Sequence, residues 1–305
     1  MDVSIIIVNY NTRDLLKDCL ISIYKHTTEI DFEVIVSDNG SVDGSIEMLK
    51  KEFPQVVLIE NNANLGFGTA NNRGLAVAKG KYIFYLNSDT ILLNNAVKMF
   101  YDYWETSPEK ESIGALGCNL LDQNLIVSDS FGNFPDVNDT IVELVKANYG
   151  VIKYLLQWIC GRREFGVTKV KYKYEYYVGE VDFVVGADLF MKNNKLALFD
   201  ENIFLYCEEL DLQYQIMKKG LKRCLIDGPR IMHLEGQSSK GKDPLPFEEI
   251  TSFSSRCNNI SRIYYLRKNV SHLKAFLVKI LTIILFLNPL VIRYTYRSMG
   301  ELIRR

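Results

Sequence analysis

Apolar residues along the first half of the chain follow two alternating spacings. Val3 to Val8 is an apolar run, whereas from Thr12 to Lys25 apolar residues recur every three or four positions. The first spacing predicts a buried strand and the second an amphipathic helix. The same alternation predicts further strands at 33–36, 56–59 and 82–86 and further helices at 43–53 and 69–79.

Strands that alternate with helices predict an α/β fold with a doubly wound, mainly parallel sheet. Such sheets bind ligands at the carboxyl ends of their strands. The second half is less regular and predicts strands at 113–120 and 181–185, with helices at 140–158 and 209–219. We therefore expect the functional site where polar residues follow the strands.

A last apolar segment, 275–292, is interrupted at Lys279, Thr282, Asn288 and Pro289. It is too short and broken for a membrane-spanning helix, which needs roughly 20 apolar residues. Basic residues flank it: Lys268, Lys274, Arg293 and Arg297. This pattern favours a helical tail that lies on an anionic membrane surface. The alternative is a helix packed on the rest of the chain or on a second subunit.

The composition is that of a globular protein, because 48% of the 305 residues are hydrophobic and 24% are charged. From Arg267 onward, eight Lys or Arg residues accompany one acid, Glu301, so the rest of the chain is acidic. This distribution excludes a general nucleic-acid binder. The six cysteines form no CxxC pair, and Met1 leads directly into a strand. We therefore expect reduced thiols, no signal peptide and a cytoplasmic catalytic part.

Polar residues follow the first two predicted strands. The segment SIIIVNYN ends where a helix begins, and a helix start suits an anion, although Asn11 or Thr12 as a plain helix cap is the alternative. The segment VSDNGSVDGS holds four polar residues that could meet the edge of a nucleobase: Asp38, Asn39, Ser41 and Asp43. A simple turn is the alternative there.

The segment NNANLGFGTANNRG follows the third predicted strand. It has neither a complete GxGxxG nor a P-loop ending, but its small residues would let a ligand approach the backbone. We expect Asn71, Asn72 and Arg73 to face the same region. Arg73 could pair with a phosphate, with a solvated helix position as the alternative.

Two segments suggest a metal site and a base. In YLNSDT, Asn87 and Asp89 could bind a divalent cation that bridges a diphosphate, unless Asp89 caps a helix. His233 is a further candidate ligand, with a structural histidine as the alternative. In YCEELDLQYQIMKKG, the carboxylates of Glu208, Glu209 and Asp211 repel one another, which suits a general base. An acidic helix N-terminus is the alternative.

The ordered set SIIIVNYN, VSDNGSVDGS, NANLGFGTANNRG, NSDT, VGADLFM, FDENIFLYCEELDL and His233 resembles the family 2 glycosyltransferases of GT-A fold. Within that family it is similar to rhamnosyltransferase-like enzymes of bacterial cell-surface polysaccharide assembly. The resemblance covers roughly residues 3 to 239. It implies inverting transfer of a sugar from a nucleoside-diphosphate sugar, with dTDP-rhamnose as the first candidate, to an acceptor hydroxyl.

The resemblance also implies residue roles. Asp38 would contact the nucleobase, Asp89 and His233 would bind Mg²⁺ or Mn²⁺, and Glu209 would be the base. The acids beside that base would be Glu208 and Asp211. The donor would be lined by Val8, Asn9, Asn11, Asp38, Asn39, Ser41, Asn64, Gly66, Phe67, Gly68, Asn71, Asn72, Arg73, Asn87 and Ser88.

Two positions depart from the family pattern. Asn87 replaces the first acid of the DxD motif, which weakens a direct metal contact there. Glu209 replaces the commoner Asp, so an extra methylene moves the carboxylate, although a base must lie within about 3 Å of the proton it removes.

The resemblance implies a nucleotide-sugar-binding half at 1–115, an acceptor-binding and catalytic half of the same domain at 116–240, and the tail at 241–305. The expected partners are the donor, a saccharide or lipid-linked acceptor, and the inner face of the cell membrane; a homodimer stays open. The Lys and Tyr stretch at 169–177 could help bind the acceptor, with a solvated loop as the alternative.

Two other functions are weighed against this one. A sugar nucleotidyltransferase would show a Gly-rich, Arg-containing loop where this chain has NYNTRD. A catalytically inactive glycan-binding scaffold would have no need of Asp89, Glu209 and His233.

Overall fold

The predicted alternation of strands and helices is present in the computed structural model. The structure describes residues 1–135, 137–138, 140–142, 144–146, 149, 174–234 and 252–287. The N-terminal elements are β1 (Val3–Asn9), α1 (Arg13–His26), β2 (Phe32–Asp38), α2 (Ser45–Glu52), β3 (Val57–Glu60), α3 (Phe67–Val77) and β4 (Tyr82–Leu86). Strand β4 has the predicted bounds, whereas α3 begins and ends two residues earlier than predicted.

The central sheet has eight strands in the order β3-β2-β1-β4-β10-β6-β11-β8. The strands from the second half are β6 (Ile113–Cys118), β8 (Gly179–Val181), β10 (Asp188–Lys192) and β11 (Lys222–Ile226). Strand β1 pairs in parallel with β2 and β4, while β10 lies antiparallel between β4 and β6. The mainly parallel α/β prediction is therefore confirmed. Strand β10 had not been predicted.

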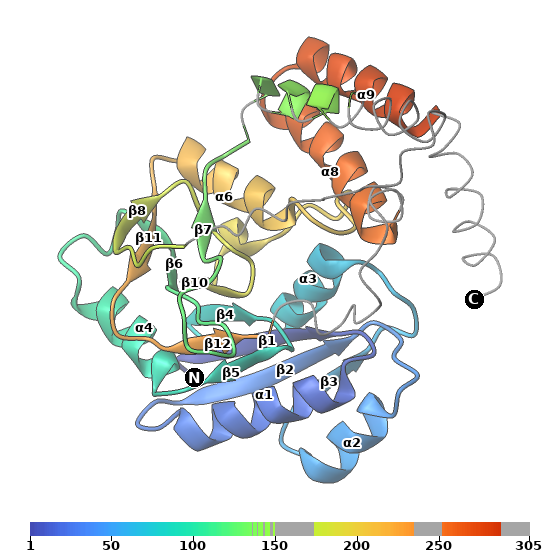
Figure 1. Cartoon of the computed structure of the whole chain (residues 1–305). Helices are drawn as coiled ribbons and strands as arrows, with labels where there is room; N and C mark the ends of the chain where they lie inside the picture. The colour runs from blue at the N-terminus through green and yellow to red at the C-terminus, as the bar shows by residue number, and fades with distance from the viewer. Residues whose placement is uncertain are drawn as a thin grey trace. The chain divides into compact units, whose positions relative to one another are not determined.

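Both faces of the sheet are covered, which explains why the strands are apolar throughout. Ile5 and Ile7 of β1 belong to one buried cluster, together with apolar residues of α1, α2 and α4 (Ala96–Thr106). Ile6, on the opposite face, belongs to a second cluster with residues of α6 (Glu208–Lys218) and the 3-10 helix η1 (Lys195–Ala197). Figure 1 shows α1 and α3 on opposite faces of the sheet.

Two short sheets complete this part of the chain. One pairs β5 (Thr90–Leu92) with β12 (Ile231–His233), and the other pairs β7 (Phe131–Gly132) with β9 (Phe183–Val184). The strand predicted at 181–185 is therefore two short strands, β8 and β9, that pair with different partners. The strand predicted at 113–120 ends at Cys118.

The chain divides into two compact units. The first comprises residues 1–134, 173–204 and 208–240, and the second 135–172, 205–207 and 241–305. The second contains α8 (Phe253–Asn269) and α9 (His272–Leu287), which pack together. The predicted helix at 140–158 is helical where it is described, up to residue 149, and its remainder lies outside the described residues.

The predicted helical tail is present in part. Helix α9 covers its beginning, and residues 288–292 lie outside the described residues. Within the described part of the chain, no helix is both long and apolar enough to cross a membrane.

Candidate active site

Asn9 and Asp38 lie opposite each other at the ends of the parallel strands β1 and β2, and both are fully buried. The Asn9 side-chain amide donates to Asp38 Oδ2 at 2.7 Å and to Ser41 Oγ at 3.0 Å. Asp38 Oδ1 accepts from the backbone N–H groups of Gly40 and Ser41 at 3.0 and 2.8 Å. The predicted nucleobase contact thus also holds the loop after β2 in place.

Thr12 stands at the N-cap of α1, as the alternative to an anion site predicted, but it does not act as a plain cap. Thr12 makes no side-chain capping bond; its hydroxyl donates to Asn9 Oδ1 at 2.7 Å and lies 2.9 Å from Ser88 Oγ. Asp43, from the next loop, accepts from the first N–H of α1 at 2.8 Å. These bonds connect the ends of β1, β2 and β4, and only the fold brings their partners together.

Gly66 has a structural requirement that the sequence did not reveal. Its φ is 86°, and a β-carbon there would lie 2.3 Å from the carbonyl oxygen of Phe204. Asn39 donates to the Gly66 carbonyl at 3.1 Å, and Asn64 Oδ1 accepts from the Gly66 N–H at 3.0 Å. Gly66 therefore permits the loop before α3 to approach Phe204 closely, and the side chains of Asn39 and Asn64 hold that loop in place.

Asn71, Asn72 and Arg73 do not face one region, contrary to the prediction. The Asn72 amide is buried and exchanges two hydrogen bonds with the backbone of Phe199, both 2.9 Å long. Asn71 is also buried and donates to Phe67 within α3, whereas Arg73 is exposed. Successive helix residues rotate by about 100° around the axis, which separates their surroundings.

The candidate metal ligands meet at the carboxyl end of β4. Strand β12 pairs with β5, and this brings His233 Nε2 to 3.2 Å from Asp89 Oδ1. The Asn87 side-chain amide lies 3.4 Å from the same nitrogen, across 146 positions of sequence. Asp89 precedes a strand, and α4 begins only at Ala96, so the alternative in which it caps a helix is wrong.

This donor set fits a divalent cation. Two ligands at right angles on an octahedral ion with bonds of about 2.1 Å lie about 3.0 Å apart, close to the separation of the Asp89 and His233 atoms. In the described part of the chain, no group of three or more His, Cys, Asp or Glu side chains could hold a metal by itself. Further ligands would therefore have to come from the donor phosphates, water or an amide oxygen of Asn87.

The acidic pair lies at the start of α6. Glu208 is buried, and its burial together with the charge of Glu209 raises its pKa well above the usual range. Burial also raises the pKa of Glu209, and the negative charge of Asp129 adds to this effect. A carboxylate with a raised pKa binds a proton more readily, which suits a general base. Asp211 is buried in the same turn.

The Gly186–Ala187 turn lies beside the candidate base Glu209 and beside Asn87. A β-carbon on Gly186 would lie 3.5 Å from Glu209 Cβ, and the Ala187 carbonyl accepts from the Asn87 N–H at 3.1 Å. The next residue, Asp188, is fully buried, and its Oδ2 accepts from the Cys118 N–H at 2.7 Å. Sequence reasoning missed Asp188, although an acid within the apolar run VGADLFM is a signal that could have found it.

Comparisons with known proteins point to glycosyltransferases. Residues 4–130 match the model of the family described as glycosyl transferase family 2. A poly(ribitol-phosphate) beta-glucosyltransferase of Bacillus spizizenii is 34% identical over 121 residues, which are 38% of this chain and 19% of that protein. An N-acetylglucosaminyl-diphospho-decaprenol L-rhamnosyltransferase of Mycobacterium tuberculosis is 25% identical over 231 residues, or 71% of each chain.

A solved structure is also similar. The mannosyltransferase PcManGT from Pyrobaculum calidifontis, in complex with GDP-Man and Mn²⁺, aligns with a TM-score of 0.52 and 16% identity, over 96% of this chain and 83% of that chain. The fold is therefore that of the GT-A glycosyltransferases. Over residues 4–130, the chain is similar to glycosyl transferase family 2.

Proposed function

We propose that this protein is an inverting glycosyltransferase that moves a sugar from a nucleoside-diphosphate sugar to a hydroxyl of a saccharide or lipid-linked acceptor, in the assembly of a cell-surface polysaccharide. The observation that carries the proposal is the meeting of Asp89 and His233 at 3.2 Å, beside Asn87, at the carboxyl edge of the sheet. The family match favours this function over a sugar nucleotidyltransferase or an inactive scaffold.

Different residues of the chain would bind the metal, bind the nucleoside and accept the proton. Asp89 and His233 would hold Mg²⁺ or Mn²⁺, whose positive charge would offset the negative charge of the departing diphosphate. The loops fixed by Asn9, Asp38 and Asn39 would hold the nucleoside. Glu209 would take the proton of the acceptor hydroxyl while the hydroxyl oxygen attacks the anomeric carbon of the donor sugar. Rhamnose is the first candidate sugar, on the resemblance and on the name of the mycobacterial relative.

Substitution of Asp89 and Glu209 tests the roles separately. Asp89→Ala should abolish donor turnover and weaken metal-dependent donor binding. Glu209→Gln should leave donor binding unchanged and slow transfer by about 10²- to 10⁴-fold, the usual contribution of a positioned base. Nucleotide release measures turnover by each variant, and donor titration measures its donor binding. Glu47→Gln, at an exposed position of α2, is the control. Full activity of either site variant would remove that residue from the mechanism.

We also propose that α9 binds an anionic membrane surface. Its exposed apolar residues recur every three or four positions: Leu273, Phe276, Leu277, Ile280, Ile283 and Ile284. The exposed Lys274 and Lys279 lie on the same helix. Ala275 and Val278, in contrast, are buried. Apolar side chains beside lysines suit the boundary between acyl chains and anionic headgroups.

A double substitution tests the membrane contact. Phe276→Glu with Ile284→Glu should abolish cosedimentation with phosphatidylglycerol vesicles, because it places two charges in the apolar face. Ile126→Glu, at a residue that is 62% exposed in a loop of the first unit, is the matched control and should sediment like the wild type. Unchanged sedimentation of the double variant would contradict the proposal.

A further inference from the structure

A pocket of about 430 Å³ lies at the β8 edge of the sheet, several strands away from β4, which Asp89 follows. Its lining comes from β7, β8, β11 and the segments beside them: Phe131, Asn133, Tyr177, Glu180, Val181, Asp182 and Arg223. The volume falls in the lower part of the range of small-ligand sites, about 300–1,000 Å³. None of the roles assigned above uses this pocket.

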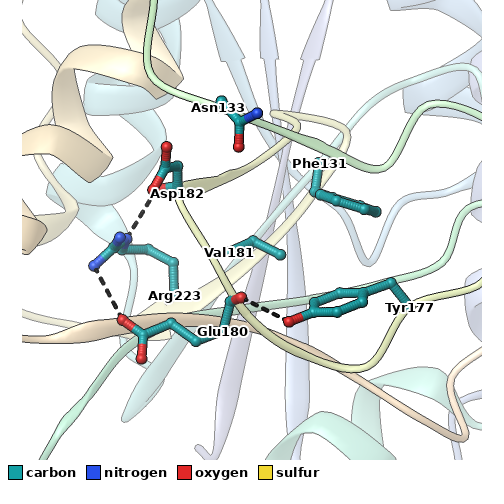
Figure 2. A pocket seen from close by; sticks show the side chains of 7 residues that line it. All are labelled: Phe131, Asn133, Tyr177, Glu180, Val181, Asp182 and Arg223. Atoms are coloured by element: carbon teal, nitrogen blue, oxygen red, sulfur yellow. Dashed lines mark hydrogen bonds and ion pairs between the residues drawn. The ribbon is translucent and has the colours of Figure 1, made fainter.

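The lining has an aromatic side and a charged side. Figure 2 shows Phe131 and Tyr177 on one side of the pocket and Arg223, Asp182 and the Glu180 carboxylate on the other. The two rings lie 5.4 Å apart at an angle of 35°. Tyr177 is 41% exposed, and its hydroxyl donates to the Glu180 carbonyl at 3.1 Å. The ring is thus held at the pocket wall while part of it faces solvent.

Arg223 on the charged side is fixed and almost completely buried, with 5% of its surface exposed. Its Nε donates to the Asp182 carbonyl at 2.9 Å, and its Nη1 donates to the Leu221 carbonyl at 2.7 Å. The Glu180 carboxylate lies 4.0 Å from Nη1. The pocket wall therefore places a guanidinium, two of whose nitrogens already donate to carbonyls, beside the carboxylates of Glu180 and Asp182, and neither sign of charge is in large excess.

This lining matches an uncharged ligand with one apolar face and many hydroxyl groups. A free anion would meet two carboxylates, and a free cation would meet a buried guanidinium. A sugar ring can place its C–H face on an aromatic ring and its hydroxyl groups toward donors and acceptors of both kinds. We propose that this pocket binds one sugar residue of the acceptor saccharide, an inference that rests on the proposed transferase function.

Hydrogen bonds connect the segments of the pocket wall to the end of β6 and to α6, the helix that carries Glu209. Asn119, directly after β6, exchanges two hydrogen bonds with the Tyr177 backbone, at 2.7 and 3.0 Å. Gln213 of α6 exchanges two more with Val184, two residues after Asp182, and also donates to the Glu209 carbonyl at 3.3 Å. A sugar in the pocket would therefore be held by the same framework that positions the base.

Binding of simple sugars to the full-length protein tests the inference. The probes are methyl glycosides of glucose, N-acetylglucosamine and rhamnose, observed by saturation-transfer NMR. At least one should bind the wild type, and Tyr177→Ala should weaken it by about tenfold, the equivalent of one aromatic contact. Tyr177→Phe, which keeps the ring, should bind almost normally. Tyr103→Ala, which removes a tyrosine that is 43% exposed on α4, is the matched control.

Kinetics separate this inference from the proposed function. Tyr177→Ala should raise the KM for a saccharide acceptor about tenfold and leave donor hydrolysis without acceptor unchanged. Equal sugar binding by Tyr177→Ala and wild type, or no binding of any probe to the wild type, would overturn the pocket assignment. Sugar binding that depends on Tyr177 in a protein that turns over no nucleotide sugar would instead contradict the transferase function and keep the pocket.

Discussion

Polar side chains at the ends of β1 and β2 are satisfied by one another, as buried polar groups must be. Asn9 and Asp38 are both fully buried, and their amide and carboxylate are joined at 2.7 Å. Their positions after apolar strands indicated a ligand site. The structure adds that several of their hydrogen bonds go to Gly40 and Ser41, in the loop after β2 that the ligand would contact.

Asp188 gives a prediction on pH and stability. Burial raises its pKa to about 8, from a usual value near 3.8. The folded state therefore binds more protons than the unfolded state between these values, so the free energy of unfolding falls as the pH rises through this window. The slope is at most about 1.4 kcal/mol per pH unit. Asp188→Asn removes the charge, so the variant should gain stability relative to the wild type between pH 5 and pH 8.

Urea unfolding at pH 5, 6.5 and 8 measures this difference. Asp14→Asn changes a carboxylate whose side chain is 80% exposed, and its effect should vary little with pH. A stability difference between Asp188→Asn and wild type that stays constant from pH 5 to pH 8 would contradict the prediction.

At the scale of elements, two glycines that share a positive φ have different functions. Gly66 and Gly220 both have positive φ, 86° and 71°. A β-carbon at Gly220 would meet nothing within 4 Å, whereas one at Gly66 would clash with the Phe204 carbonyl. Gly220 follows the end of α6, where a glycine with positive φ is common. Gly66 instead allows the loop before α3 to approach residue 204.

This difference predicts unequal effects of alanine. Gly220→Ala should cost about 1 kcal/mol of unfolding free energy, the penalty for left-handed backbone, and should keep donor affinity. Gly66→Ala adds a clash, so it should cost clearly more and weaken donor binding, because Asn39 and Asn64 both bond to Gly66. Urea unfolding and nucleotide-sugar titration of both variants provide the measurements. Equal stability losses would show that the approach to Phe204 relaxes without cost.

At the scale of the whole molecule, the proposed site is assembled from residues between Asn9 and His233, all within the first compact unit. A ligand that binds only the folded state stabilises it by about 2.7 kcal/mol at 100 times Kd. The correct nucleotide sugar with Mn²⁺ should therefore raise the Tm by several degrees. Each component alone should raise it less than the pair does.

A thermal-shift screen of nucleotide sugars with and without Mn²⁺ measures this coupling. Asp89→Ala should abolish the joint effect, while Glu209→Gln should keep it, because only the former removes a proposed metal ligand. Donor turnover that persists in excess chelator would contradict the requirement for a cation.

The sequence alone determined the order β1-α1-β2-α2-β3-α3-β4 and the polar residues after each strand, because apolar periodicity and strand-end chemistry are local properties of a chain. Only the tertiary structure decided the antiparallel insertion of β10, the burial of Asp188 and the different surroundings of Asn72 and Arg73. The meeting of Asn87 and His233 across 146 positions depends on β12 pairing with β5. Strand pairings of this kind depend on which sheet faces and edges the rest of the fold leaves uncovered. The local spacing of residues in the sequence does not determine them.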